Sequence, residues 1–252
     1  MQHVVITGAN RGIGLELARH YQAEGWRVTG TCRESSPDLE EYAEQVIARI
    51  DVADADSLAR LAAALQGQTI DLLINNAGIL HDDVLGSLDI ESLRRQMEVN
   101  AFAPLLICEA LLPNLEPGSK IANITSRMGS LGDNDSGGRY GYRASKAAFN
   151  AFGRSLAIDL KGRGIAVAQL HPGFVKTRMV NYGGLITTAE SVAGLVERFL
   201  TGSAALFNGE EFVTFVTGGD GDAFLESLPA QCHRVDNMVL RGLAVLAAGG
   251  SR

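Results

Sequence analysis

Short apolar runs alternate with longer stretches of helical periodicity along most of the chain. The runs have the length and composition of buried parallel strands. The predicted strands are His3–Ile6, Arg27–Thr31, Val46–Ile50, Ile70–Ile74, Lys120–Ile124, Ile165–Leu170 and Glu211–Val216. The predicted helices are Ile13–Ala23, Ser57–Leu65, Ile90–Leu112, Tyr142–Lys161 and Ala189–Leu200. This alternation predicts a parallel sheet covered by helices on both faces, with ligands bound at the carboxyl ends of the strands.

Composition narrows the class of protein. A length of 252 residues, 46% hydrophobic and 20% charged, fits one large globular domain. The net charge of -7 argues against partners such as nucleic acid or an anionic membrane. Cys32, Cys108 and Cys232 form no CxxC pair, so we expect no disulfide framework, no metal site and a cytoplasmic location. From the strand-like start and the lack of a long apolar run, we expect neither a signal peptide nor a membrane-spanning segment.

A glycine-rich turn follows the first predicted strand. The segment TGANRGIG (residues 7–14) holds Gly8, Gly12 and Gly14 at a GxxxGxG spacing. Glycines permit a tight turn and close approach of the backbone, and the following helix would direct free amides and a positive dipole end at a pyrophosphate. The alternative is an ordinary turn between a strand and a helix.

Two arginines favour NADPH over NADH. NAD sites usually carry an acidic residue at the end of the second strand, whereas NADP sites use arginine for the 2′-phosphate. Here the second predicted strand is followed by Cys32 and Arg33, with no acid before Glu34, and Arg11 lies inside the glycine turn. Either arginine alone could be a solvated surface charge.

Two further loops lie at predicted strand ends. Asp51 and Val52 follow the third strand, where a carboxylate and an apolar side chain could bracket an adenine; the alternative for Asp51 is a helix cap or turn residue. The sequence NNAG (75–78) follows the fourth strand, where small residues would allow close approach to a cofactor. On its own it could be only an Asx turn.

The segment RYGYRASK (139–146) offers a candidate acid. Residues four apart share one face of a helix, so Tyr142 has Lys146 beside it, whereas the corresponding partner of Tyr140 is Ala144. A lysine cation is expected to lower the pKa of a tyrosine and make it a better proton shuttle. The alternative is a pair of ordinary side chains at a helix start.

Two more polar residues could assist this tyrosine. Ser126 ends the fifth strand, where it could hydrogen-bond a substrate oxygen, and Ser130 competes for that role. Asn100 lies inside a predicted helix with Pro104 close behind, which predicts a local kink that frees a carbonyl. A tolerated asparagine is the alternative.

Together, TGANRGIG, NNAG, Asn100, Ser126, the Tyr142/Lys146 pair and HPGFVKT (171–177) resemble the short-chain dehydrogenase/reductase family, over about residues 1–217. The resemblance implies a single-domain, doubly wound Rossmann fold with a seven-stranded, mainly parallel sheet. It implies a tetrad in which Tyr142 is the general acid, Ser126 polarises the carbonyl, Lys146 binds the ribose and Asn100 holds a relay water. The implied NADP(H)-binding residues are Gly8, Asn10, Arg11, Gly12, Ile13, Gly14, Arg33, Asp51, Val52, Asn76, Ala77, Gly78, Tyr142, Lys146, Pro172, Gly173, Val175 and Thr177.

Two segments depart from the family pattern. The fifteen residues between Ser126 and Tyr142 include an extra loop, DNDSGGR, which we expect at the substrate mouth. Residues 218–252 form an atypical extension in which MVLRGLAVLAA could be a helix, a dimer contact or a tail.

The leading functional hypothesis is an NADPH-dependent carbonyl reductase that acts reversibly on a ketone or aldehyde and its alcohol, a small-molecule substrate. The TGANRGIG, TCR and GYRASKAA segments look like the C-factor-like or carbonyl-reductase-like branch, so the second hypothesis is a dinucleotide-binding signalling protein with incidental catalysis. The resemblance also implies a homodimer or homotetramer.

Overall fold

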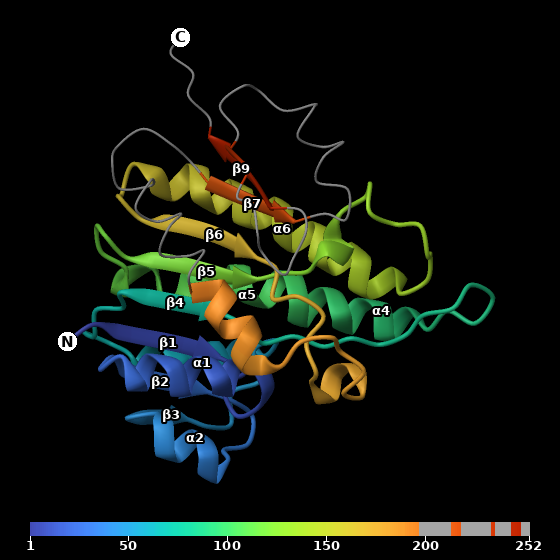
Figure 1. Ribbon diagram of the computed structural model, residues 1–252. Coiled ribbons are helices and arrows are strands. Elements are labelled where there is room, and N and C mark those ends of the chain that lie inside the picture. The colour runs from blue at the N-terminus through green and yellow to red at the C-terminus, as the bar shows by residue number, and fades with distance from the viewer. Residues whose placement is uncertain (197–212, 218–232, 235–242, 248–252) are drawn as a thin grey trace.

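The sheet at the centre of the molecule contains six parallel strands (Figure 1). The computed structural model describes residues 1–196, 213–217, 233–234 and 243–247. The strand order is β3-β2-β1-β4-β5-β6. The strands are β1 (His3–Thr7), β2 (Arg27–Thr31), β3 (Gln45–Ile47), β4 (Leu72–Asn75), β5 (Lys120–Ile124) and β6 (Ala166–Leu170). The order reverses between β1 and β4, so the loops after these two strands meet at the switch point where such folds bind ligands.

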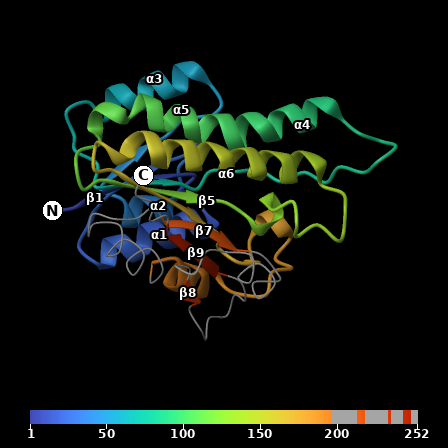
Figure 2. The ribbon, with the colours of Figure 1, turned by 90° about the horizontal axis from the view of Figure 1, so that it is seen from above.

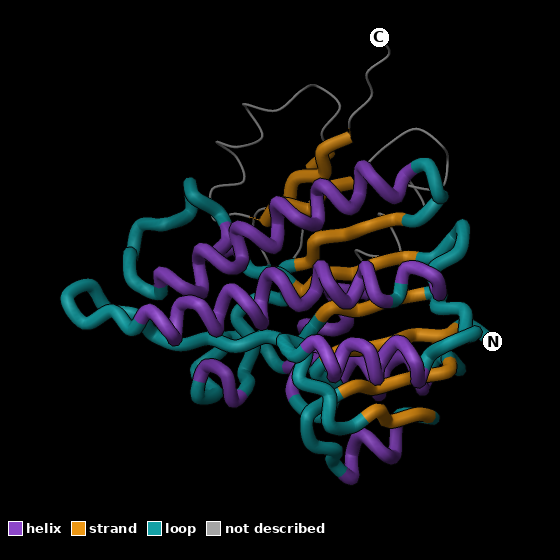
Figure 3. The backbone as a smooth tube through the Cα atoms, turned by 180° about the vertical axis from the view of Figure 1, so that it is seen from behind, coloured by secondary structure: helices purple, strands orange, loops and turns teal. Residues whose placement is uncertain are grey.

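Helices cover both faces of this sheet (Figures 2 and 3). One face packs against α1 (Gly12–Ala23), α2 (Pro37–Tyr42) and a helix at 188–196. The other is covered by α3 (Ala55–Ala64), α5 (Ala103–Ala110) and α6 (Tyr140–Lys161), and α4 (Ile90–Met97) packs against α6. Each face has its own buried apolar cluster, as a doubly wound fold requires. The predicted doubly wound fold is confirmed.

No helix in the described part of the chain combines the length and apolarity needed to cross a bilayer.

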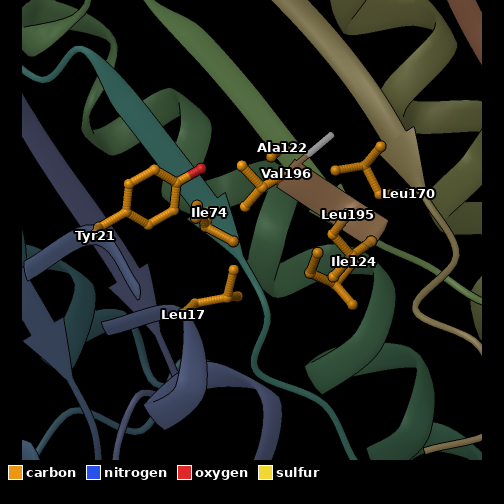
Figure 4. A pocket seen from close by; sticks show the side chains of 8 residues that line it. All are labelled: Leu17, Tyr21, Ile74, Ala122, Ile124, Leu170, Leu195 and Val196. Carbon is orange, nitrogen blue, oxygen red and sulfur yellow. The ribbon is translucent and has the colours of Figure 1, made fainter. Parts of the chain in front are cut away.

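A small gap lies between the sheet and the helices on the first face (Figure 4). Apolar side chains and Tyr21 line it, and none of them belongs to a predicted site: Leu17, Tyr21, Ile74, Ala122, Ile124, Leu170, Leu195 and Val196. It therefore lies apart from the predicted site.

The sheet has six hydrogen-bonded strands where seven were expected. Strand β7 (Val213–Thr217) lies beside β6 in Figure 1 but joins a separate antiparallel sheet of order β7-β9-β8. Its partner there is β9 (Leu243–Ala247), with β8 (His233–Arg234) on the far side of β9. Helix was one expectation for MVLRGLAVLAA, and it is wrong at 243–247, where pairing with β7 satisfies the backbone as a strand. The other residues of the predicted 218–252 extension lie outside the described residues, apart from β8.

The predicted helix Ile90–Leu112 is interrupted as its sequence suggested. Between α4 and α5 lies a π-helical turn, η1 (Glu98–Phe102), which contains Asn100. Pro104 lies at the start of α5 and has no N–H to donate to the carbonyl of Asn100 four residues earlier. The irregularity expected at Asn100 therefore takes the form of a π-helical turn.

Candidate active site

The loops after β1 and β4 are bonded to each other. The Asn76 side-chain amide donates to the carbonyls of Thr7 (2.9 Å) and Gly8 (3.1 Å). The Thr7 hydroxyl accepts from the backbone N–H groups of Asn76 (3.0 Å) and Ala77 (3.1 Å). The NNAG segment is thus more than a local Asx turn, because it fixes the glycine turn against the end of β4.

The three glycines of TGANRGIG serve different contacts. Gly8 has a φ of +65° and lies where a Cβ would approach Ala77 Cα to 3.0 Å. A Cβ on Gly14 would be 2.3 Å from the Gly8 carbonyl oxygen. Gly12, with a φ of +58°, faces Thr177, whose Cγ2 would be 3.5 Å from an added Cβ. A side chain at Gly8 or Gly14 would therefore clash with neighbouring backbone. The absence of a side chain at Gly12 allows Thr177 to lie close to the start of α1.

The start of α1 is suited to an anion. Arg11 is its N-cap residue and provides no side-chain cap, so the first-turn amides of Gly12 and Ile13 have no acceptor from that residue. Free amides and the positive end of the helix dipole stabilise phosphate. The residues present therefore fit a pyrophosphate between α1 and Thr177.

Asn10 connects this turn to the loop after β2. Its amide donates to the Glu34 carbonyl at 2.9 Å, and its own carbonyl accepts from the Ser36 hydroxyl at 3.0 Å. The two predicted cations, Arg11 and Arg33, therefore belong to loops that are bonded together. Both are exposed, and neither forms an ion pair with another described residue.

Asp51 lies in the neighbouring loop after β3. Burial raises its pKa, but the hydrogen bond from the Ala53 N–H (3.0 Å) and the pairing with Arg95 (2.6 Å) outweigh burial and hold the pKa below its usual value. The helix-cap alternative applies instead to Asp54, which caps α3. Asp51 forms a turn with Ala53, and the adjacent Val52 is buried.

Tyr142 and Lys146 are buried on the first turns of α6. Tyr142 is 8% exposed and Lys146 is 4% exposed. The Lys146 ammonium donates to the Ile124 carbonyl at the end of β5 (2.9 Å) and lies 5.9 Å from the centre of the Tyr142 ring. Burial lowers the pKa of Lys146 to about 8. The amine is thus held close to the phenol, and its burial disfavours the charged form of the lysine.

The pKa of Tyr142 moves in the opposite direction from the one its sequence suggested. Burial raises it, and the opposing effects of the Ser126 hydrogen bond and the Arg139 charge are smaller. Lys146 was expected to lower this pKa, but in this structure desolvation of the phenol dominates. The consequence is a phenol that stays protonated at neutral pH.

Ser126 rather than Ser130 is the serine that contacts Tyr142. A side-chain hydrogen bond joins the two residues, and the Ser126 hydroxyl also accepts from the Met128 N–H at 3.2 Å. Ser126 follows β5 and caps the short helix at Arg127–Gly129.

Asn100 is the hub of a buried network. Its side-chain oxygen accepts from the Ile79 N–H (2.8 Å), and its amide donates to the Ile79 carbonyl (2.8 Å) and to the Ser145 hydroxyl (3.0 Å). Ser145 in turn donates to the Tyr142 carbonyl at 2.8 Å. A Cβ on Gly78 would lie 3.2 Å from Asn100 Oδ1 and 3.9 Å from Lys146 Nζ. Asn100, Lys146 and NNAG therefore converge, although they are far apart in sequence.

The segment 171–177 reaches the same edge of the sheet after β6. Val175 is buried and bridges to Ile186, and Gly173 has a φ of +90° that favours glycine. The Pro172 carbonyl accepts from the Ser191 hydroxyl at 2.7 Å.

The loop containing DNDSGGR is held by arginines next to the predicted acid and serine. Arg143 donates to the Asp133 carbonyl (3.3 Å) and the Ser136 hydroxyl (2.9 Å), and Arg127 pairs with the Asp133 carboxylate (3.4 Å). The position of this loop is therefore fixed by the residue after Ser126 and by the residue after Tyr142.

The sequence did not identify two contributors to this arrangement. Ser145 bridges Asn100 to the backbone of Tyr142, and Asp83 accepts a hydrogen bond from the Gly141 N–H. The one available signal was Gly141 itself, an unusual residue in the first turn of a long helix. Tyr140, the other tyrosine, starts α6 and is 40% exposed.

Comparison with known proteins gives consistent results. The short chain dehydrogenase family model matches residues 2–187. The 1-hydroxy-2-glutathionyl-2-methyl-3-butene dehydrogenase of Rhodococcus sp. (strain AD45) is 39% identical over 203 residues, covering 78% of this chain and 90% of that protein. The C-signal protein of Myxococcus xanthus is 42% identical over 130 residues, covering 50% of this chain and 78% of that protein. The structure of NADPH-bound carbonyl reductase from chicken fatty liver superposes with a TM-score of 0.69 and 32% identity, covering 78% of this chain and 90% of that chain.

Proposed function

Because the chain belongs to the short-chain dehydrogenase/reductase family of oxidoreductases, we propose that it is an NADPH-dependent carbonyl reductase. It interconverts a ketone or aldehyde and the corresponding alcohol. The observation that carries the proposal is that Asn100 and Lys146 lie beside Gly78, while Tyr142 contacts both Lys146 and Ser126 at the same edge of the sheet.

Tyr142 acts as the general acid in reduction. Its raised pKa keeps the hydroxyl proton in place until negative charge develops on the substrate oxygen. The Ser126 hydroxyl donates a hydrogen bond to the same oxygen. Lys146 places positive charge near the phenolate that remains, and the Asn100 network holds the backbone of the Tyr142 turn.

The residues at the other end of the site would hold NADP(H). A bound NADPH supplies the hydride for this chemistry. The first turn of α1 and Thr177 take the pyrophosphate, while Arg11 and Arg33 take the 2′-phosphate. Asn76 to Gly78, Lys146 and the 172–177 segment would hold the nicotinamide and its ribose, and Asp51 and Val52 would hold the adenine. The NADPH bound to the similar chicken reductase supports this choice.

We place this activity in residues 1–217, with 218–252 as an extension of the same domain. A homodimer or homotetramer is proposed through the helices that carry Asn100 and Tyr142.

Oxidation of NADPH, followed at 340 nm, tests the function directly. The panel includes aldehydes, ketones and quinones. Run in reverse with NADP⁺, it includes a glutathione thioether bearing a primary alcohol, because the Rhodococcus relative is named for such a compound. Tyr142→Phe is expected to lower kcat at least about 100-fold while NADPH still binds, since only the transferable proton is lost. A wild-type protein that binds NADPH but turns over no member of the panel would refute the proposal.

A signalling role is the second candidate, favoured by the similarity to C-signal over half of this chain. The two roles differ in their dependence on Tyr142. A cellular phenotype of gene deletion that Tyr142→Phe rescues as fully as the wild type would support signalling without catalysis.

A further inference from the structure

The first turn of α6, which carries Tyr142, has no side-chain hydrogen bond from its own N-cap residue. The N-cap residue Arg139 has a left-handed backbone (φ 50°, ψ 43°) and makes no side-chain capping hydrogen bond. The helices α2, α3 and α4, in contrast, are each capped by a local serine or aspartate. Since the first N–H groups of a helix have no acceptor within it, the start of α6 needs a partner from elsewhere.

Asp83 supplies that partner from a segment 58 positions earlier. Its Oδ2 accepts from the Gly141 N–H at 2.8 Å, and its carbonyl accepts from the Arg139 N–H at 3.1 Å. Asp83 is only 5% exposed. A buried carboxylate at a helix N-terminus combines a charge-assisted hydrogen bond with a favourable interaction with the helix dipole.

Gln96 and Gly141 complete the contact. The fully buried Gln96 side chain donates to Asp83 Oδ2 at 3.3 Å and accepts from the His81 N–H at 3.1 Å. A Cβ on Gly141 would lie 2.6 Å from Gln96 Nε2 and 3.2 Å from Asp83 Oδ2. Glycine at this position therefore lets the helix approach the carboxylate, which explains its presence directly before Tyr142.

The segment 79–83 consequently acts as a strap between two parts of the site. At one end Asn100 binds both backbone groups of Ile79, immediately after Gly78. At the other end Asp83 holds the residue before Tyr142. The strap links the NNAG segment to the turn that carries the proposed acid.

We infer that Asp83 is a positioning residue, which sets the place of Tyr142 by capping α6 across the strap. This inference rests on the proposed function, since it assigns Asp83 a part in that reaction. Asp83 acts through the backbone of Gly141 and touches neither substrate nor cofactor. A displacement of a catalytic group by about 1 Å can slow turnover about 100-fold.

The test compares three variants with wild type. Asp83→Ala removes the acceptor, and Asp83→Asn keeps one oxygen that can accept from Gly141. Asp82→Ala is the matched control, because this exposed neighbour pairs with the Arg139 side chain, among the described residues, and does not accept from the Gly141 N–H. We expect Asp83→Ala to lower kcat at least about tenfold with KM for NADPH within about twofold, Asp83→Asn to recover most of kcat, and Asp82→Ala to resemble wild type.

Hydrogen–deuterium exchange of peptides covering 138–146 provides a readout that does not depend on activity. Exchange there should rise in Asp83→Ala and stay low in Asp83→Asn. If wild type is inactive, the proposed function fails while this measurement still tests the cap. A folded, normally melting Asp83→Ala protein with wild-type kcat, or an Asp83→Asn protein as slow as Asp83→Ala, would overturn the positioning role.

Discussion

Asn100 and Lys146, at the nicotinamide end of the proposed cofactor site, are buried and hydrogen-bonded to backbone groups, whereas the two cations at the adenosine end are exposed. Asn100 and Lys146 are 1% and 4% exposed, and each has defined backbone partners. Arg11 and Arg33 lie on surface loops without an ion pair among the described residues.

This difference follows from what each end has to do. Proton transfer requires atoms held at fixed distances in a medium of low dielectric constant. Burial of Tyr142 and Lys146 provides this medium, although it costs the free energy of their desolvation. Recognition of a 2′-phosphate requires only positive charge within reach, which exposed guanidinium groups supply. Catalytic rate and cofactor preference should therefore be separable by mutation.

The largest expected effect comes from breaking the buried end. Asn100→Ala leaves both backbone groups of Ile79 without their partner, which should lower the free energy of unfolding by about 1–3 kcal/mol. Because the Tyr142 turn also loses its link through Ser145, kcat should fall about 100-fold. Steady-state kinetics and urea unfolding measure both effects. Glu98→Ala, an exposed position in the same π-helical turn, is the control and should stay close to wild type. Equal effects at the two positions would contradict the buried network.

A pH-dependent effect should also belong to the buried end. Burial lowers the pKa of Lys146 to about 8, so between about pH 8 and its unfolded value of 10.5 the unfolded chain binds more protons than the folded one. The free energy of unfolding should therefore rise with pH across this window.

Lys146→Met removes this dependence. Without added cofactor, wild type should gain about 2 kcal/mol relative to the variant between pH 8 and pH 10. Urea unfolding of both proteins at the two pH values gives the difference, and other titrating groups cancel in the comparison. Parallel behaviour of the two proteins would mean that Lys146 is solvated.

The smallest effect is expected at the exposed end. Arg33→Ala should raise KM for NADPH about tenfold, because one charged contact to the 2′-phosphate is lost. The KM for NADH, which lacks that phosphate, serves as the control and should hardly change. The kcat should also stay close to that of wild type. Equal weakening of both cofactors would remove Arg33 from the 2′-phosphate site and leave Arg11 as the remaining candidate.

Relations within one element, or between consecutive elements, could be predicted from the sequence. The alternation of strands and helices, the Tyr142–Lys146 spacing on one helix face and the irregular turn at Asn100 before Pro104 all depend on local periodicity or on the chemistry of proline. These features survive folding because a helix repeats regularly, whatever is packed around it.

Relations between distant segments came only from the tertiary structure. It showed the contact between Ser126 and Tyr142, raised the pKa of Tyr142 by burial, paired β7 with β9 and placed Asp83 against Gly141. Each of these features depends on desolvation or on contact between residues that are distant in the chain. Desolvation and long-range contact are not properties of the local sequence. The sequence by itself determined which residues were available for the chemistry, and packing decided their partners and their protonation.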